Sequence, residues 1–595
     1  MENYSTGTVK GVIANLLLVT TNGPVAQNEI CYVSHQRKEL MAEVIKVIGD
    51  TAYIQVFDST RGIYAGSLVR FTGSLLDVTL GPGMLSRNYD GLQNDLDALE
   101  GLFLEKGDRS PALDADKKWE FSPLVKDGEH VKAGHWLGTV PEFNISHKIM
   151  VPLDMEGDYR VVEIATEGYY IARDIIAVLV NENGERYEIS MIQRWPVKLP
   201  ITRYEHKPRP SRILKTGVRS IDSLNPILEG GTGFIPGPFG CGKTVLQHAI
   251  SKQAAADIVI VAACGERANE VVEILDEFPR IKDPRTGRLL NERTVIIANT
   301  SNMPVAAREA SVYTAMTIAE YYRQMGLRVL LLADSTSRWA QALRETSNRL
   351  EDLPGPDAYP MDLSAIISNF YARAGSVKLF NGETGAITFI GTVSPAGGHL
   401  KEIVTESTNK ATRCFYALSQ QRADGKRYPA IDPVMSYSKY LEYPEFKNYS
   451  NENIGEDYLD NIEKMKTHLK LGDDARNQIN ILGDDGVPIN YHIQFWRAEL
   501  IDFVVLQQDA FDEVDAMTPM ERQMELIRLV LEVCQHEFSF EDYDKVAAFY
   551  KTIINLFKQM NYAVYQSENY QKYLKDIQVI LLEKGEQKNP ANDGD

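Results

Sequence analysis

The sequence predicts a multidomain protein in which two β-rich domains precede a parallel α/β domain and a C-terminal helical domain. Three observations support this fold class. Short apolar runs separated by glycine-containing turns continue to about Pro200, strands and helices alternate from Gly217 to about Asp432, and few glycines follow Gly486. Because 595 residues are too many for one hydrophobic core, several domains are expected.

Residues 1–72 have the pattern of a small antiparallel β-barrel. The apolar runs Val44–Val47 and Ala52–Val56 are separated by Gly49-Asp50, a dipeptide typical of turns. Short strands joined by tight turns are typical of a closed barrel. Residues 110–195 show the same pattern, with glycines between aromatic and β-branched residues, and predict a second β-rich domain inserted before the α/β region.

Four apolar runs of the α/β region are expected to be its strands: Ile258–Ala263, Thr294–Ala298, Val329–Ala333 and Ala386–Val393. Helical stretches separate them, as in a parallel sheet covered on both faces. After about Asn451 the chain is rich in Leu, Ile, Lys and Glu. There Met520–Cys534 and Tyr543–Met560 are expected to form amphipathic helices.

The composition excludes several classes of function. A net charge of −19 leaves no excess of cations for general binding of nucleic acid or of a membrane surface. The five cysteines form no CxxC pair, so neither a zinc site nor a disulfide framework is indicated, which fits a reducing cytoplasm. No apolar stretch has the length of a membrane span. If the protein works at a membrane, other subunits are expected to hold it there.

The segment Gly237–Thr244 is a complete G-x-x-x-x-G-K-[ST] phosphate-binding loop. Its glycines allow backbone N–H groups to turn toward phosphate oxygens. Lys243 supplies a charge for the β- and γ-phosphates, and the Thr244 hydroxyl is a ligand for Mg²⁺. Val245–Ala256 is expected to be a helix, which places the loop at a helix N-terminus, where the helix dipole favours anions.

Cys241 lies inside this loop, next to a helix N-terminus and close to Lys243. Both neighbours favour the thiolate form of a cysteine. We therefore expect a reactive thiolate at Cys241, and we expect its modification to block nucleotide binding.

Charged residues follow two of the predicted strands. Asp334 ends the run from Val329, where a P-loop enzyme places a carboxylate that helps to hold Mg²⁺, although an Asp that caps the next helix would give the same pattern. Glu266 and Arg267 follow Ile258–Ala263, where they could polarise water and neutralise charge on the γ-phosphoryl group, or form a surface ion pair. Arg338, four residues past Asp334, could contact the γ-phosphate or a neighbouring carboxylate, or lie on a helix surface.

Together these segments resemble the catalytic A subunit of V-type/A-type rotary ATPases, within the ATP synthase alpha/beta family. The resemblance covers nearly the whole chain. The matching segments are Leu80–Leu85, Tyr89–Gln93, Pro236–Val245, Cys264–Glu270, Asn299–Ala310, Ala333–Ala340, Ser394–Gly398 and Pro429–Ser438. The chain departs from the family pattern at Ala268, Asn348 and His399.

The resemblance implies a role for each candidate residue. Glu266 would be the general base or orient water, Arg267 would be its electrostatic partner, and Arg338 would assist at the γ-phosphate. Thr244 would be a direct ligand of Mg²⁺, and the Asp334 carboxylate would stabilise the ion from outside the direct ligands. The residues expected to bind ATP or ADP are Gly237, Pro238, Phe239, Gly240, Cys241, Gly242, Lys243, Thr244, Val245 and, as aromatic walls for adenine, Tyr428 and Phe511.

The resemblance also implies the domains and partners. A RecA-like nucleotide-binding domain would comprise residues 73–109 and 196–435, between the N-terminal barrel and a helical domain of residues 436–595. The chain would alternate with a B subunit in an A3B3 hexamer, contact central-shaft and peripheral-stalk subunits, and couple ATP hydrolysis or synthesis to H⁺ or Na⁺ transport through other, membrane-bound subunits. It would be cytoplasmic and peripheral to the membrane.

Two other functions remain open at this point. A hexameric RecA-like translocase or secretion ATPase would assemble with itself and would be active without a partner chain. A nucleotide-binding regulatory subunit would not hydrolyse ATP, and the Glu266-Arg267 pair speaks against it, because such a subunit needs no base.

Overall fold

The computed structural model describes residues 5–36, 38–98, 107, 109–301, 303–395 and 398–585. Asn302, Ala396 and Gly397 of the matching segments, parts of the predicted 73–109 region and the last ten residues of the predicted 436–595 domain lie outside the described residues. The chain divides into two compact units. The first unit comprises Met1–Pro208, Ala256–Val393 and Lys401–Ala411, and the second comprises Arg209–Ala255, Ser394–Leu400 and Thr412–Asp595.

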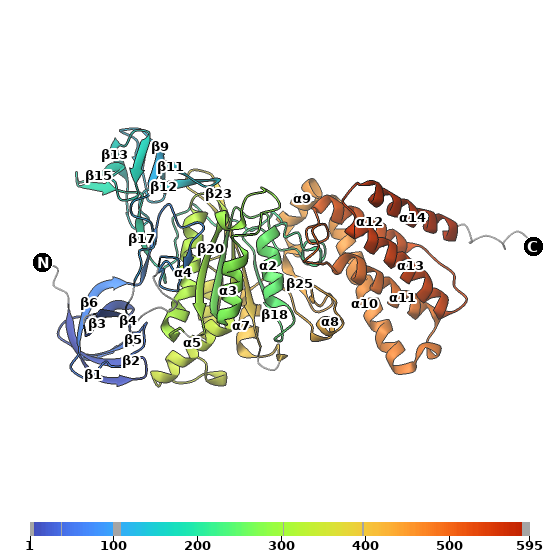
Figure 1. The fold of residues 1–595 in the computed structure, drawn as a ribbon, viewed down its shortest axis with the longest axis horizontal. Helices are drawn as coiled ribbons and strands as arrows, with labels where there is room; N and C mark the ends of the chain where they lie inside the picture. Colours follow the sequence, from blue (N-terminus) through green and yellow to red (C-terminus); the bar gives the residue numbers. More distant parts are fainter. Residues whose placement is uncertain are drawn as a thin grey trace, which may run out of the picture. The chain divides into compact units, whose positions relative to one another are not determined.

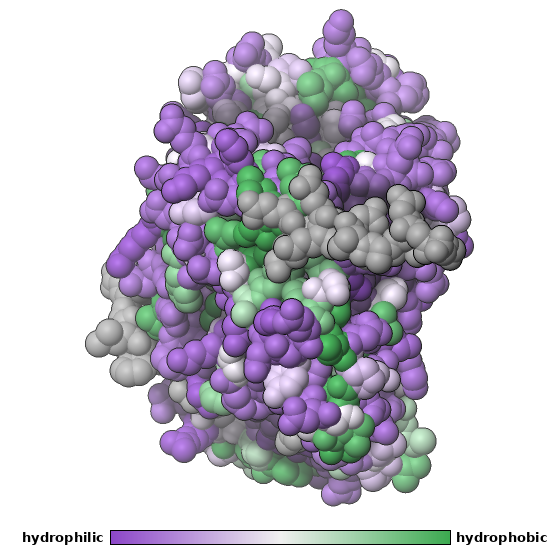
Figure 2. All heavy atoms as spheres, turned by 90° about the vertical axis from the view of Figure 1, so that its right-hand side faces the viewer, coloured by the Kyte–Doolittle hydropathy of each residue, from purple (hydrophilic) through white to green (hydrophobic). Residues whose placement is uncertain are grey.

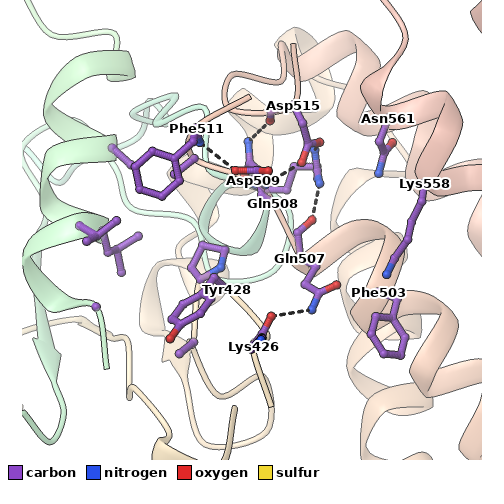
Figure 3. Close-up of a pocket in the computed structure, with 18 of the residues that line it drawn as sticks. Lys426, Tyr428, Phe503, Gln507, Gln508, Asp509, Phe511, Asp515, Lys558 and Asn561 are labelled. Atoms are coloured by element: carbon purple, nitrogen blue, oxygen red, sulfur yellow. Dashed lines mark hydrogen bonds and ion pairs between the residues drawn. The ribbon is translucent and has the colours of Figure 1, made fainter. Parts of the chain in front are cut away.

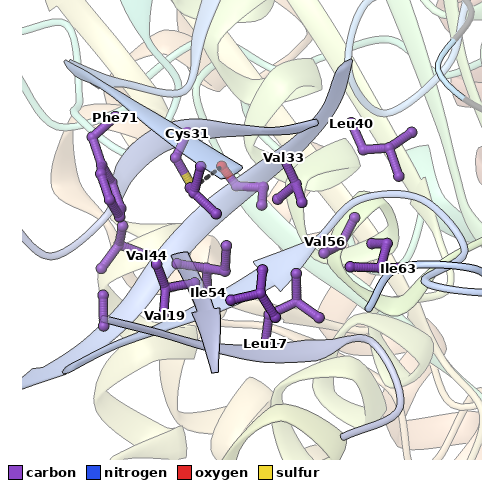
Figure 4. Close-up of a cluster of buried hydrophobic side chains, with 14 residues drawn as sticks. Leu17, Val19, Cys31, Val33, Leu40, Val44, Ile54, Val56, Ile63 and Phe71 are labelled. Carbon is purple, nitrogen blue, oxygen red and sulfur yellow. Dashed lines mark hydrogen bonds between the residues drawn. The ribbon is translucent and has the colours of Figure 1, made fainter. Parts of the chain in front are cut away.

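The first unit begins with a closed six-stranded antiparallel barrel, drawn in blue in Figure 1. Its strands, in the order in which they pair, are β1 (Thr6–Ile13), β2 (Leu16–Thr21), β5 (Thr51–Val56), β4 (Lys38–Ile48), β3 (Glu29–His35) and β6 (Leu68–Leu75). Alternate residues of these strands point inward and make a core of aliphatic side chains closed by Phe71 (Figure 4). The barrel predicted for the N-terminal region is therefore confirmed.

The inserted β-rich region contains two four-stranded antiparallel sheets. One has the order β10 (His130–Val131), β13 (Tyr159–Ile164), β15 (Ala177–Asn181) and β16 (Arg186–Ile189). The other has the order β12 (Ile145–Met150), β11 (Trp136–Glu142), β9 (Lys118–Pro123) and β14 (Gly168–Ile171). The chain returns through β17 (Gln193–Pro196), which pairs with β7 (Asp77–Leu80).

Buried polar contacts attach this inserted region to helix α4 (Val305–Arg323) and the turn after it. The Trp136 indole N–H donates to the Gln324 carbonyl at 3.0 Å, and a ring nitrogen of His147 lies 2.9 Å from the Tyr321 hydroxyl. The other ring nitrogen of His147 lies 2.6 Å from the Glu142 carboxylate, which also accepts from the Gly83 and Leu85 N–H groups. The His147 ring and the Glu142 carboxylate are thereby paired, as their burial requires.

A parallel sheet forms the centre of the first unit. Its strands follow the order β8 (Asn88–Tyr89), β20 (Thr294–Thr300), β19 (Ile258–Glu266), β21 (Arg328–Asp334) and β23 (Thr384–Val393), with β22 (Gly375–Lys378) antiparallel to β23. The helices of this unit are α3 (Ala268–Glu277), α4, α5 (Thr336–Arg349), α6 (Leu363–Tyr371) and α7 (Ile403–Ala411). The four predicted strands are all present. Their interiors are apolar without alternation because helices cover both faces of the sheet.

The second unit contains strands β18 (Thr232–Pro236), β24 (Cys414–Phe415) and β25 (Tyr437–Ser438) and helices α1 (Arg219–Asp222), α2 (Lys243–Gln253) and α8 (Gln420–Asp424). Strand β18 is parallel to β24, which is antiparallel to β25. Helix α2 ends three residues before the predicted Ala256, because the Ala255 N–H donates to the Lys215 carbonyl rather than continuing the helix.

The C-terminal part of the second unit is a bundle of helices, coloured orange to red in Figure 1. Its helices are α9 (Pro444–Asn453), α10 (Tyr458–Leu482), α11 (Ile489–Ile501), α12 (Met520–Gln535), α13 (Tyr543–Tyr562) and α14 (Glu568–Gly585). The two predicted amphipathic helices correspond to α12 and α13. On the side of the molecule where the C-terminal helices lie, the visible surface is mostly hydrophilic and carries separate groups of hydrophobic residues (Figure 2). Within the described residues, no helix has the length and apolar character of a membrane span.

Candidate nucleotide-binding and catalytic site

The phosphate-binding loop connects β18 to α2 in the second unit. Gly240 and Gly242 have φ angles of 85° and 82°, a conformation that favours glycine, and Gly242 is the N-cap of α2. The loop therefore lies at a helix N-terminus, as the sequence predicts, where backbone N–H groups and the helix dipole favour an anion. The Lys243 ammonium donates to the Gly237 and Pro238 carbonyls at 2.7 and 3.2 Å, so this charge is held over its own loop.

The structure contradicts the expectation of a thiolate at Cys241. The side chain is 1% exposed, and its Sγ lies 3.2 Å from Gln420 Oε1 as a hydrogen-bond donor. Burial raises the pKa of the Cys241 thiol, Lys243 lowers it by less, and Asp424 raises it further. The helix N-terminus and Lys243 do not compensate for the loss of water, so the neutral thiol is the favoured form.

A cavity of about 510 Å³ lies beside the phosphate loop, entirely within the second unit. Tyr428 and Phe511 both line it, and a Cβ atom placed on Gly242 would lie 3.7 Å from Tyr428 Cε1. Figure 3 shows Phe511 beside α2, with Phe503 and Lys558 on helices across the cavity. The two predicted aromatic walls thus line one cavity next to the loop, although they lie 83 positions apart in the sequence.

Both walls present aromatic surface that the protein itself does not cover. Phe511 is 89% exposed and Tyr428 is 44% exposed. Large exposed aromatic faces at a cavity are typical of ligand sites, because a flat base can stack on them. The cavity is therefore lined both by glycines of the anion-binding loop and by the two aromatic walls.

Glu266 and Asp334 lie in the first unit, at the carboxyl ends of neighbouring parallel strands. Strand β19 ends at Glu266 and β21 ends at Asp334, and Asp334 is in register with Ala263. The Asp334 carboxylate accepts a hydrogen bond from the Thr392 hydroxyl at 2.5 Å. The carboxyl ends of strands are where parallel α/β sheets bind ligands.

The pKa of Glu266 is raised to about 7. Burial is the largest cause, repulsion from the Asp334 carboxylate adds to it, and the Arg338 guanidinium opposes it. A carboxyl group with a pKa near neutral pH can both accept and return a proton, which is the property required of a general base.

Arginines from three segments lie near the end of strand β19: Arg267, Arg308 and Arg338. The Arg338 guanidinium lowers the pKa of Glu266, and Arg267 follows Glu266 directly in the chain. Both Arg267 and Arg338 are exposed, and Arg338 donates to Gln341 Oε1 at 3.0 Å. Arg308, which the sequence does not single out, is buried and donates to the Ser301 carbonyl at 3.2 Å, and its chain packs against Gly265.

Two predicted magnesium residues carry hard oxygen donors, which suit Mg²⁺. Thr244 lies in the first turn of α2 and is half-buried. Asp334 is 8% exposed and acts as a carboxylate fixed by Thr392. Each side chain has chemistry that suits the ion, Thr244 in the second unit and Asp334 in the first. Elsewhere in the described ranges, no group of three or more His, Cys, Asp or Glu side chains is arranged to hold a metal.

Sequence reasoning missed the residues that hold the aromatic walls. Gln508 donates its backbone N–H to the Tyr428 carbonyl at 2.9 Å, and its side chain accepts from the Arg219 backbone N–H at 2.9 Å. Asp515 and Arg219 form a buried ion pair behind the same cavity. No local pattern marks these residues, because each is ordinary in its own segment and acquires its role through a distant one.

Family models match four segments of the chain. The nucleotide-binding domain of the ATP synthase alpha/beta family matches residues 217–438, and the beta-barrel domain of that family matches residues 9–73. The ATP synthase alpha/beta subunit barrel-sandwich domain matches residues 110–198. The C-terminal domain of V and A type ATP synthase matches residues 447–547. Together these matches include most of the barrel, the inserted region and the nucleotide-binding region, and the helical bundle as far as residue 547.

The relatives that match along nearly their whole length are V-type ATP synthase alpha chains. The V-type ATP synthase alpha chain of Treponema denticola is 45% identical over 98% of this chain and 97% of its own length. That of Borrelia recurrentis is 46% identical over 97% of this chain and 99% of its own length. That of Protochlamydia amoebophila is 45% identical over 98% of both chains. The similarity therefore extends over every region, the inserted one included.

Proposed function

The chain belongs to the ATP synthase alpha/beta family, as a V-type alpha chain that turns over ATP, and from this premise we propose that it is the catalytic subunit of a rotary ATPase. In this role it couples ATP hydrolysis or synthesis to the transport of H⁺ or Na⁺. The observation that carries the proposal is the cavity of the second unit, in which the phosphate loop and two aromatic walls offer matching surfaces to the two ends of one nucleotide.

The nucleotide would be held by side chains at both ends of that cavity. Lys243 and the backbone of Gly237–Thr244 would bind the β- and γ-phosphates, with Val245 continuing the loop into α2. Tyr428 and Phe511 would stack on the adenine ring. On phosphate binding, the Lys243 ammonium would exchange its hydrogen bonds to the Gly237 and Pro238 carbonyls for bonds to phosphate oxygens.

Thr244 and Asp334 would hold Mg²⁺, Thr244 through its hydroxyl and Asp334 through its carboxylate, directly or through water. When bound, the ion would neutralise charge on the phosphate oxygens. Thr392 would keep the Asp334 carboxylate in a fixed orientation through its 2.5 Å hydrogen bond.

Glu266 would accept a proton from the attacking water during hydrolysis. A group with a pKa near 7 is partly in its basic form at neutral pH, so it can take the proton without a large energetic penalty. Arg338 would favour the ionised form of Glu266 and would approach the γ-phosphoryl group. Arg267, exposed at the N-cap of α3, would add positive charge at the same strand end.

The proposed site is incomplete without a partner. We propose that a B subunit supplies the remaining arginine at an A–B interface of an A3B3 hexamer, because such an arginine contributes about 10³- to 10⁵-fold in rate. Central-shaft and peripheral-stalk subunits would connect the ring to membrane subunits that carry the ion. The chain itself would be cytoplasmic and peripheral to the membrane, and the proposal includes no nucleic acid.

The domain boundaries predicted from the sequence remain part of this proposal: a barrel at 1–72, an insertion at 110–195, a nucleotide-binding domain at 73–109 and 196–435, and a helical domain at 436–595.

The exposed apolar side chains Ile481 and Leu482, 75% and 56% exposed at the end of α10, are suited to contact with a partner subunit.

The test is ATPase activity of this chain alone and after mixing with its B subunit. The proposal predicts little turnover by the chain alone and at least a hundredfold more from the mixture, which is a conservative share of the arginine effect. Full activity of the chain alone, as a homohexamer, would overturn the shared site and favour a self-assembling translocase.

A further inference from the structure

The position of the Phe511 ring is not fixed by packing of its own side chain. A ring that is 89% exposed has little packing to fix it in place. Its location therefore depends on the backbone of residues 507–518, which joins the helical bundle to the cavity. Whatever holds this segment also holds the aromatic wall.

Arg219 holds the segment at several points. It is 2% exposed, lines the cavity and uses every part of its guanidinium group. Its Nε donates to the Val505 carbonyl at 3.0 Å, its Nη1 donates to the Thr518 hydroxyl at 2.9 Å and to Asp515 Oδ1 at 2.5 Å, and its Nη2 donates to the Gln507 carbonyl. One rigid fork thus joins the two ends of the segment.

The ion pair continues directly to Phe511. The second oxygen of Asp515 accepts from the Asp509 N–H at 2.7 Å, and Asp509 Oδ1 accepts from the Phe511 N–H at 2.9 Å (Figure 3). Each link in this chain is a hydrogen bond to a carboxylate, which is stronger than a neutral one. A displacement of Asp515 would therefore be passed to the backbone that carries the ring.

Gln508 connects the same network to the opposite wall. Its side-chain amide donates to the Gly217, Asp515 and Ala516 carbonyls at 2.8 to 2.9 Å and accepts from the Arg219 N–H. Its own N–H donates to the Tyr428 carbonyl at 2.9 Å. The spacing between the two aromatic walls is consequently set by Arg219 and Gln508 rather than by the walls themselves.

We propose that Arg219, through Asp515 and Gln508, is the positioning residue that sets the base-binding half of the cavity while leaving the phosphate-binding half unaffected. The inference rests on the proposed function, because it assumes that Tyr428 and Phe511 bind the base. In this role Arg219 would not itself bind the nucleotide. It acts by holding the 507–518 segment at the distance from Tyr428 that a flat base requires.

The experiment measures two affinities of the full-length chain, one for ATP and one for inorganic tripolyphosphate, which has no base. Arg219→Met is expected to weaken ATP binding about 5- to 150-fold, the range for loss of base stacking, with tripolyphosphate binding changed less than threefold. Phe511→Ala should give a loss in the same range. The double variant should lose less affinity for ATP than the product of the two single losses, because Arg219 and Phe511 would act through the same wall.

Further variants keep the test decisive. Asp515→Asn preserves the volume of the side chain but removes its charge, so it should give the same selective loss even if Arg219→Met folds poorly. Arg497→Met is the matched control, because Arg497 also donates to a backbone carbonyl of the helical bundle, that of His536, but does not line the cavity. It should leave both affinities unchanged.

The outcomes separate the two ideas. Equal affinities for ATP and tripolyphosphate in the unaltered chain would refute base binding and, with it, this inference. A strong preference for ATP that survives both Arg219→Met and Asp515→Asn would overturn the positioning role but leave the proposed function standing. Equal loss of ATP and tripolyphosphate binding in these variants would also overturn it, because Arg219 would then not act on the base-binding half alone.

Discussion

Replacing Tyr428 by alanine is expected to raise the Kd for ATP about 30-fold. Tyr428 is 44% exposed at the edge of the cavity. A tyrosine side chain buries about 200 Å² when fully covered, so a stacked base would remove about 90 Å² of ring surface from water. At about 25 cal/mol per Å², this is roughly 2 kcal/mol, within the range of about 1–3 kcal/mol measured for base–aromatic stacking.

The assay is isothermal titration of the purified chain with ATP and, separately, with tripolyphosphate. The alanine variant should lose affinity for ATP and keep affinity for tripolyphosphate, because the phosphate loop is unchanged. Tyr428→Phe is the control. It retains the ring and loses only the hydroxyl, which donates to the Ala423 carbonyl at a long 3.4 Å, so its Kd should stay within about threefold of the unaltered value.

Two results would refute the reasoning. An alanine variant that binds ATP within threefold of the original would mean that the ring is not part of the base site. Equal loss in the alanine and phenylalanine variants would mean that the hydroxyl, rather than the aromatic surface, provides the interaction.

Three further predictions follow from the same structure. Glu266→Gln should retain nucleotide binding and lower turnover of the assembled ring about 10²- to 10⁴-fold, whereas Lys243→Ala should weaken binding itself; normal turnover with glutamine would exclude a base role. Because the pKa of Cys241 is raised, its alkylation should be slow at pH 7 and should rise about tenfold per pH unit up to pH 8. ATP should slow the alkylation. A rate that reaches a plateau below pH 8 would indicate a thiolate and contradict this prediction. Glu320→Ala should destabilise the first unit by about 3–5 kcal/mol in thermal or denaturant unfolding, because it leaves the buried Arg373 guanidinium, now bonded at 2.5 and 3.1 Å, without its carboxylate; a change below 1 kcal/mol would contradict this.

The sequence predicts best where function depends on a short, contiguous segment. The phosphate loop specifies its own conformation, because glycines stand at the two positive-φ positions, Gly240 and Gly242, and a helix follows. Glu266 and Asp334 could also be paired from the sequence, since each ends an apolar strand and the carboxyl ends of parallel strands share one edge.

The prediction that depended on burial, a thiolate at Cys241, was wrong, and the reach of long side chains was not predictable. The sequence places Cys241 beside a cation and a helix N-terminus, yet its pKa is raised because neighbouring segments exclude water from the thiol. Arg338, which follows a different strand, lowers the pKa of Glu266 although it lies far from Glu266 in the sequence. Linear proximity determines neither desolvation nor the direction of a long side chain.

The sequence by itself determined the kinds of chemistry available: a phosphate loop, a carboxylate at each of two strand ends, and aromatic residues suited to a base. Only the tertiary structure decided how the base pocket is built, because its supports lie far apart in the chain. Arg219 and Gln508 are 289 residues apart, and their hydrogen bond exists only once the helical bundle has packed against the domain that carries the phosphate loop. Local residue patterns encode helices, strands and turns, whereas the pairing of buried polar groups depends on which distant segments meet.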